Sequence, residues 1–286
     1  MVLLQNSETN EIAAAKIFSQ GAETKNALAE REASLHRTLK HENIIEFKDF
    51  QKNLTIEDAE GNQEQVTAML LEYAAKGDLF DLIENFNSMP LFLARSFAKQ
   101  VVEAIAYLHE RGIAHRDIKL ENFLLDAKYR VKLADFGLSC HTDKDELLTE
   151  ANGTLQYQAP EQHAKKPYNG FQVDVFSLGV VIFLLVAGRM PFLKADSEDE
   201  YYKDFVTGDV EKFWEKQEEL VDYPSEKAFF QKDFRDLMNG MLCYKPEDRF
   251  TIKDVVSHPW MTVSSLPFDK CSEIVAEVFK KKALKP

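Results

Sequence analysis

Apolar residues near the N-terminus follow the patterns expected of short strands. Residues 2–4 and 12–18 are predicted to be two strands around a polar turn at Asn6–Asn10. The continuous apolar run over 66–73 predicts a further strand, buried on both faces. Val131-Lys132-Leu133-Ala134 is another short apolar run, and it leads directly into charged residues.

Other apolar residues recur at the spacing of helices. A helix is predicted over 22–40, where Leu28, Leu35 and Leu39 stand among many charges. An amphipathic helix is predicted over 92–110, with Phe97, Val101, Ala104, Ile105 and Leu108 on its apolar face. The run Leu178 to Ala187 is far shorter than the roughly 18 apolar residues that suggest a membrane span. Val175–Val186 is therefore expected to be a core helix.

The polar residues with the most chemistry lie between His115 and Glu161. An ionic run holding Asp117, Lys119 and Asn122 ends against apolar Phe123-Leu124-Leu125, and Asp135 follows the next short strand. Two acids and an amide at strand ends beside a lysine suit a phosphorylated, metal-bound ligand. Turn chemistry is the alternative for each residue taken alone, since Asp and Asn are common in loops.

Composition narrows the possible partners. A net charge of −13 over 286 residues argues against a nucleic-acid binder and against tight binding to anionic membranes. It is compatible with basic peptide substrates. The three cysteines show no paired spacing, which predicts neither disulfides nor a zinc site. With no signal peptide visible, a reducing, cytoplasmic location is expected.

Taken in order, these motifs resemble the eukaryotic protein kinases of the serine/threonine type. The catalytic loop is matched by His115–Asn122, the magnesium loop by Asp135-Phe136-Gly137 and the end of the activation segment by Tyr157–Glu161. The resemblance covers nearly the whole chain and is closest to the calcium/calmodulin-dependent and AMP-activated kinases. It implies an α+β, bilobal fold, divided into a partial β-rich N-lobe, a helical C-lobe and a tail at 1–73, 74–262 and 263–286. The tail is expected to be a solvated terminus, with a partner-binding helix as the alternative.

The resemblance also implies the roles of individual residues. Asp117 would accept the substrate hydroxyl proton, Lys119 would contact the transferred phosphoryl group, and Asn122 and Asp135 would hold Mg²⁺. ATP would be held by Lys16, in the sequence Ala14-Ala15-Lys16. Glu32 would pair with Lys16, and Glu30 is the competing choice. The rest of the nucleotide site would comprise Val2, Ala14, Leu71, Glu72, Ala74, Asp78 and Leu124.

Further positions bear on regulation and on substrate class. Lys119 together with Thr154 favours serine/threonine over tyrosine substrates, and Asp78 with Glu121 favours basic residues upstream of the target. Leu184 replaces a further acidic position of such relatives, which weakens that preference. Glu150 stands at the usual phosphothreonine position and would partly neutralise Arg116. Phosphorylation of Thr149 or Thr142 by an upstream kinase stays open.

Structural roles follow from the same resemblance. Asp174 would brace the catalytic loop, and Glu161 would pair with Arg249. His36 stands four residues after Glu32, where the family usually has an apolar residue packed toward Phe136. Its ionisation would make the position of that helix sensitive to pH.

One family motif is missing from this chain. No Gly-x-Gly-x-x-Gly occurs, and counting back from Lys16 places the glycine-rich loop upstream of Met1. Either the sequence starts late, or the protein lacks its first strand and phosphate lid, and Val2 is the last remnant of the adenine ceiling. A pseudokinase scaffold is therefore an alternative, although Lys16, Asp117, Asn122 and Asp135 are all present. A small-molecule kinase is a third possibility.

Overall fold

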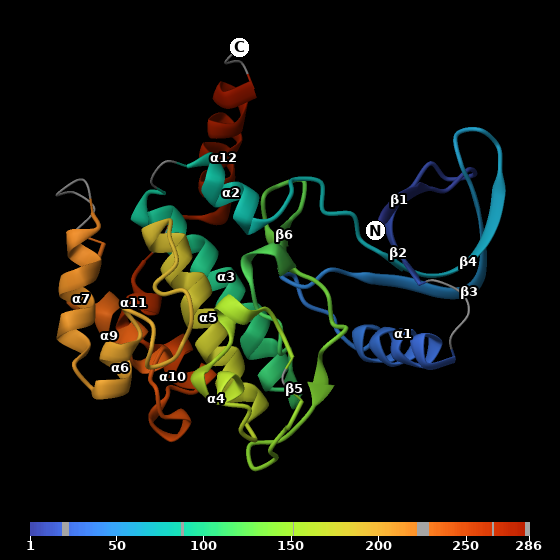
Figure 1. Cartoon of the computed structure of the whole chain (residues 1–286). Helices are drawn as coiled ribbons and strands as arrows, with labels where there is room; N and C mark the ends of the chain where they lie inside the picture. The colour runs from blue at the N-terminus through green and yellow to red at the C-terminus, as the bar shows by residue number, and fades with distance from the viewer. Residues whose placement is uncertain (19–22, 87–88, 151, 222–228, 265, 284–286) are drawn as a thin grey trace.

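The computed structural model describes residues 1–18, 23–86, 89–150, 152–221, 229–264 and 266–283. It has a small lobe built on an antiparallel sheet and a larger helical lobe, as Figure 1 shows. The sheet has the strand order β1-β2-β4-β3, and helix α1 packs beside it. These elements are β1 (Val2–Gln5), β2 (Ile12–Phe18), α1 (Glu23–His36), β3 (Phe47–Glu57) and β4 (Gln63–Leu71). Residue 22, where the helix was expected to start, lies outside the described residues.

The register of β1 corrects one sequence prediction. Ala14 pairs with Leu3, whereas Val2 pairs with Ala15. Directly paired residues share a face of the sheet, and successive residues alternate between faces. Leu3 therefore lies on the face of Ala14 and Lys16, and Val2 lies on the opposite face. Val2 is therefore not on the face of the sheet where the adenine ceiling was predicted, whereas Leu3 is.

Strand β3 has no counterpart among the predicted elements. It pairs with β4, but the register shifts between Phe47 and Asp49 and again between Gln51 and Leu54. These irregularities break the strict alternation of apolar and polar residues on which strand prediction depends.

The helical lobe is built around two long helices that pack against each other. These are α3 (Leu91–His109) and α5 (Gly170–Ala187). Within the described residues, α5 alone is long and apolar enough to cross a membrane, but 83% of it is buried in the protein. Its prediction as a core helix is confirmed. The surrounding helices are α2 (Leu79–Asn85), α4 (Pro160–His163), α6 (Lys203–Thr207), α7 (Val210–Glu219), α9 (Lys232–Met241), α10 (Ile252–Ser257) and α11 (Pro259–Thr262).

Two small two-stranded sheets carry the polar stretch that dominates the sequence. Strand β6 (Phe123–Leu125) pairs with β7 (Val131–Leu133), and β5 (Ile113–Ala114) pairs with β8 (Cys140–His141). Because β6 and β7 are antiparallel, the residue before β6 and the residues after β7 meet at one end of the hairpin. The amide of Ala134 accordingly donates to the carbonyl oxygen of Asn122 at 2.8 Å. This contact sets Asp135 beside the catalytic-loop sequence.

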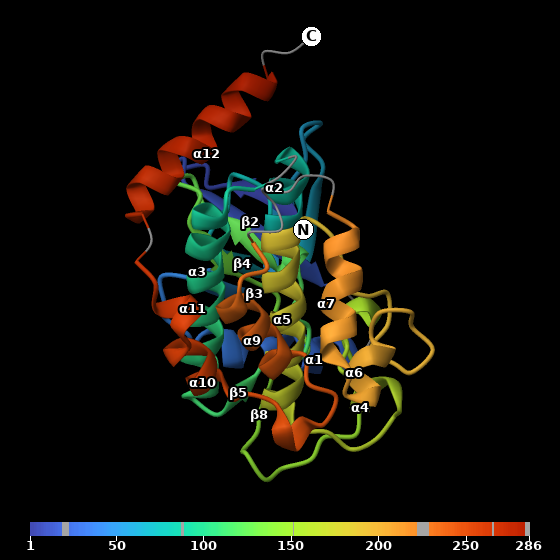
Figure 2. The same cartoon turned by 90° about the vertical axis from the view of Figure 1, so that its left-hand side faces the viewer.

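The C-terminal tail is a packed helix, so the prediction of a solvated terminus is wrong. Helix α12 (Phe268–Ala283) buries Cys271 and Val275. The Phe279 ring lies 5.5 Å from that of Tyr129, between centroids. These residues recur every four positions and form one apolar stripe. Figure 2 shows α12 extending past α3 toward the chain end, and residues 284–286 lie outside the described part.

Candidate active site

Lys16 of β2 lies between two carboxylates from different parts of the chain. Its Nζ is 2.7 Å from Glu32 Oε1 on α1 and 2.8 Å from Asp135 Oδ1 after β7. The predicted ion pair with Glu32 is therefore present. The competing residue, Glu30, pairs with Lys52 instead.

The charges in this cluster shift each other's protonation. Burial alone would lower the pKa of Lys16, because it disfavours the charged ammonium. The contacts with Glu32 and Asp135 outweigh this effect and raise the pKa of the lysine. Burial raises the pKa of Glu32, and Lys16 offsets only part of this effect. Burial also acts against the charge of Asp135, yet hydrogen bonding to Lys16 holds its pKa below the usual value. Lys16 and Asp135 are thus kept charged.

Asp117 is the centre of a second polar cluster, in the loop between β5 and β6. Its Oδ1 accepts hydrogen bonds from the Thr154 amide at 3.0 Å and from the Thr154 hydroxyl at 2.9 Å. Its Oδ2 accepts from Lys119 Nζ at 2.7 Å and from Asn122 Nδ2 at 3.2 Å. Four donors therefore hold the Asp117 carboxylate in one orientation.

The approach of Thr154 to Asp117 depends on the glycine before it. Gly153 has φ +95°, and a Cβ at this position would lie 2.7 Å from the carbonyl oxygen of Arg116. A larger residue would both strain the backbone and push Thr154 away. The activation segment thus joins the catalytic loop at this point.

The residues predicted to hold Mg²⁺ have suitable atoms available. Asn122 uses its Nδ2 for contacts with Asp117, which leaves its Oδ1 as a hard oxygen ligand. Asp135 uses Oδ1 for Lys16, which leaves Oδ2. Among the described residues no group of three or more His, Cys, Asp or Glu side chains forms a metal cage. The donor set fits a magnesium ion whose shell is completed by phosphates and water.

Asp174 supports the catalytic loop from α5, as expected. Its Oδ2 accepts from the His115 amide at 2.7 Å, and its Oδ1 accepts from the Arg116 amide at 2.8 Å. A third contact was not predicted from the sequence. His109 Nε2 lies 3.0 Å from the same Oδ2. The histidine ends an amphipathic helix, and no local pattern links it to a residue 65 positions later.

His36 packs against Phe136, at the position where the resemblance implied an apolar side chain. The two ring centroids are 4.5 Å apart, and His36 Nε2 lies 2.8 Å from the carbonyl oxygen of Ile45. Burial lowers the pKa of His36 to about 4. The ring is therefore neutral near pH 7, and its charging is confined to acid conditions.

We expect His36 to make the fold acid-sensitive. Because its folded-state pKa lies below the unfolded value, no stability is lost above pH 6.5, and the loss grows as the pH falls toward 4. The full difference amounts to about 3 kcal/mol. Urea unfolding of wild type and His36→Leu at pH 7 and at pH 4.5 measures how much of the stability lost in acid is due to His36. An equal loss in both proteins would contradict the assignment.

Most residues predicted to hold the adenine lie in one apolar cluster where the lobes meet. Leu71 is buried there, with Ala14, Ala74 and Leu124 packed around it. Asp78 pairs with Leu124 in an isolated antiparallel bridge, which sets it beside the cluster. Glu72 follows Leu71, and its carboxylate contacts Lys132 at 3.0 Å.

Two ion pairs hold the activation segment, one at its end and one within it. Arg249 donates to both carboxylate oxygens of Glu161, at 2.8 and 3.0 Å, and the pair is buried as predicted. Arg116 is also buried, and its Nη1 lies 3.8 Å from the exposed carboxylate of Glu150. The guanidinium Nε donates to the carbonyl oxygen of Leu138 at 2.7 Å.

Comparison with known proteins identifies the family to which this chain belongs. The protein kinase domain model matches residues 1–261. The serine/threonine-protein kinase SAPK1 of Oryza sativa is 32% identical over 273 residues, which cover 95% of this chain and 74% of SAPK1. The human NUAK family SNF1-like kinase 1 is 33% identical over 231 residues, 81% of this chain and 31% of that protein. This chain belongs to the protein kinase family, which confirms the resemblance found in its sequence.

The relatives differ widely in length. The yeast serine/threonine-protein kinase GIN4 is 33% identical over 274 residues, which cover 90% of this chain but only 22% of GIN4. This chain thus spans about a fifth of that relative.

Proposed function

We propose that this chain transfers the γ-phosphoryl group of ATP to serine or threonine hydroxyls of protein substrates. The observation that carries the proposal is the joint presence of two assembled clusters in one structure. Lys16 contacts both Glu32 and Asp135, and the carboxylate of Asp117 is held by Lys119, Asn122 and Thr154. The serine/threonine kinases among the relatives support it as well.

In this mechanism the protein aligns the reactants and neutralises charge. Lys16 binds the nucleotide phosphates while Glu32 holds its ammonium in place. Asp117 orients the substrate hydroxyl and accepts its proton. Lys119, held 2.7 Å from Asp117 Oδ2, contacts the transferred group.

Asn122 and Asp135 would hold a magnesium ion through their amide and carboxylate oxygens, and that ion would supply charge neutralisation at the phosphates. The adenine packs on the apolar cluster around Leu71, and the backbone groups of Glu72 and Ala74 hydrogen-bond it.

Radiolabelled ATP with a mixed Ser, Thr and Tyr peptide set tests this function. We expect label on Ser and Thr peptides only, removed by EDTA and restored by excess Mg²⁺. Asp135→Asn keeps the shape of the side chain but removes a proposed ligand, so it is expected to lose at least about 100-fold in rate. Absence of transfer from the folded wild type would overturn the proposal.

We further propose that Glu150 partly replaces an activating phosphate. Its carboxylate faces the buried Arg116 at 3.8 Å, but it carries less charge and fewer acceptor oxygens than a phosphate. The unphosphorylated protein therefore has basal activity that a phosphate on Thr149 or Thr142 raises.

After phosphatase treatment, Glu150→Ala is expected to lower kcat by about three- to tenfold, an effect of the size of one partly exposed ion pair. Glu146→Ala changes another exposed carboxylate of the same segment and serves as the matched control. Equal rates for Glu150→Ala and wild type would rule out Glu150 as a replacement for the activating phosphate.

A preference for basic substrates is proposed from Asp78 and Glu121. The pKa of Asp78 is raised, first by burial and then by the charges of Asp81 and Glu121, so these acids lie near one another. Peptides with an upstream arginine are expected to show a lower KM than their alanine versions, and Glu121→Gln should reduce that difference. An unchanged difference would remove Glu121 from the recognition of arginine.

A further inference from the structure

Three consecutive residues of the turn between β6 and β7 each contact helix α12. The pairs are Lys128–Ser272, Tyr129–Phe279 and Arg130–Phe268. The first is a hydrogen bond from the serine hydroxyl to a main-chain carbonyl oxygen, and the second is a contact between two rings. In the third, the guanidinium carbon lies 4.8 Å from the ring centroid. Helix α12 thus holds the turn of the hairpin that leads, at its other end, to the proposed magnesium ligands.

Tyr129 lies in this turn with an unfavourable backbone conformation. Its φ is +62°, in the left-handed region that glycine adopts readily and a bulky residue rarely. Such conformations persist only where surrounding contacts hold them, and they are concentrated at functional sites. The residue is only 6% exposed, so its ring is packed among other groups. The position of the ring therefore matters more than the ease of forming the turn.

The Tyr129 ring also contacts the segment that joins the two lobes, residues 74–77, which we call the hinge. Lys76 Nζ lies 5.5 Å from the ring centroid. The main chain of the hinge is joined to β6 as well. The Lys76 amide donates to the carbonyl oxygen of Leu125 at 3.0 Å, and the Leu125 amide donates to that of Gly77 at 2.8 Å. A continuous series of contacts thus runs from Phe279 through Tyr129 to the hinge.

These contacts end at the proposed nucleotide site. Leu124 precedes Leu125 in β6, and Ala74 stands two residues before Lys76 in the hinge. Both Leu124 and Ala74 pack in the apolar cluster that contains Leu71. When the hinge moves away from β6, Ala74 and Leu124 separate, and the apolar surface that packs on the adenine is disrupted.

We propose that α12 sets the affinity of the nucleotide site, with Phe279 and Tyr129 as positioning residues that hold the hinge against β6. This inference rests on the proposed function, because it concerns the site assigned there to ATP. Loss of either ring lets the two hydrogen bonds between hinge and β6 open more often. The adenine then binds to a site that is assembled for less of the time.

Hydrogen exchange of the full chain, followed by NMR, tests these contacts without requiring catalysis. We expect Phe279→Ala to speed exchange of the Lys76 and Leu125 amides at least about tenfold, because only these bonds open locally. Amides in the middle of α5 report global unfolding and should keep the wild-type rate. Unchanged exchange at Lys76 and Leu125 would overturn the proposal. Equal acceleration in α5 would also overturn it, since it would show a loss of overall stability.

Matched variants separate the Tyr129 ring from its backbone. Tyr129→Gly removes the ring and suits the left-handed turn, so it should behave like Phe279→Ala. Tyr129→Phe keeps the ring and should behave like wild type. Wild-type exchange in Tyr129→Gly would show that the ring has no such role.

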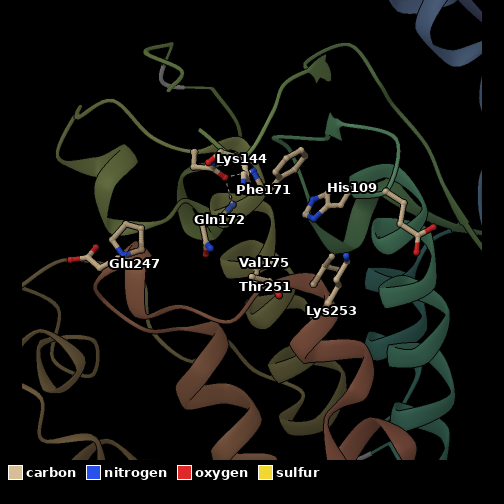
Figure 3. A pocket seen from close by; sticks show the side chains of 12 residues that line it. His109, Lys144, Phe171, Gln172, Val175, Glu247, Thr251 and Lys253 are labelled. Atoms are coloured by element: carbon tan, nitrogen blue, oxygen red, sulfur yellow. Dashed lines mark hydrogen bonds between the residues drawn. The ribbon is translucent and has the colours of Figure 1, made fainter. Parts of the chain in front are cut away.

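Two further variants are controls that should leave exchange at the hinge unchanged. Glu277→Ala alters an exposed residue of α12 itself. Lys253→Ala alters an exposed residue of α10, beside the hollow near His109 that Figure 3 shows. Figures 1 and 2 place α10 and α12 at opposite ends of the helical lobe. Acceleration at the hinge by Lys253→Ala as large as that by Phe279→Ala would contradict a specific role of α12.

ATP binding in the presence of Mg²⁺, measured by calorimetry, tests the consequence for the site. Phe279→Ala and Tyr129→Gly should each raise the Kd about three- to tenfold, the loss expected for one aromatic pair, and raise KM without lowering kcat. Unchanged or tighter binding would refute the role of α12 alone, the second because α12 would then obstruct the site. A folded wild type that binds no ATP would instead refute the proposed function, and this proposal with it.

Discussion

Replacing Asp117 by asparagine is expected to lower kcat by about 10²–10⁴-fold, the usual contribution of a positioned general base. Four donors converge on this carboxylate, two on each oxygen. An amide would turn one acceptor into a donor, so that it faces hydrogen-bond donors it cannot satisfy. The substitution thus removes the proton acceptor and disturbs Lys119 and Thr154 together.

The measurement is single-turnover transfer of labelled phosphate from ATP, with nucleotide affinity measured separately. ATP affinity should change little, because Lys16 and Glu32 lie in the other cluster. Glu103→Gln makes the same chemical change at an exposed position on α3 and should leave the rate unaltered. A folded Asp117→Asn protein that keeps its rate within about threefold would exclude Asp117 as the general base.

Replacing Arg249 by methionine is expected to cost about 3–5 kcal/mol of folding free energy. The arginine side chain is fully buried and Glu161 is 7% exposed, so the substitution leaves a carboxylate unpaired in the interior. Arg249 also donates to the carbonyl oxygens of Cys243 and Gln172, which would lose their partner. Chemical denaturation of both proteins at pH 7 gives the difference.

A surface arginine provides the comparison for Arg249. Arg130 pairs with the exposed Glu42, and Arg130→Met should cost no more than about 1 kcal/mol. The double change Arg249→Met with Glu161→Leu should recover much of the loss, since it removes the unpaired charge as well. If Arg249→Met costs as little as Arg130→Met, the buried pair does not stabilise the fold.

The choice of Glu32 over Glu30 shows what local sequence patterns can predict about the site. Residues two apart on a helix point to nearly opposite faces, so only one of these glutamates can meet Lys16. The spacing to later motifs identified Glu32, and the structure pairs it with Lys16 at 2.7 Å. The proximity of Asn122 and Asp135 was likewise predictable, because they flank the two strands of one antiparallel hairpin.

Other features had no local signal. The assignment of Val2 instead of Leu3 failed because a shift of one residue in strand register reverses the face of every side chain. The tail was taken as solvated because its lysines are prominent in the sequence. The apolar stripe of Cys271, Val275 and Phe279 acquires a partner only when Tyr129 lies opposite it.

By itself, the sequence determined the family of this protein, its long helices and most strands of its sheet, and the residue types at the site, since all of these rest on short motifs and regular periodicity. The tertiary structure alone decided the partners that no motif implied. The pairs Lys16–Asp135 and His109–Asp174 join positions 119 and 65 residues apart. Such contacts form only when separate elements pack together, so no local pattern encodes them.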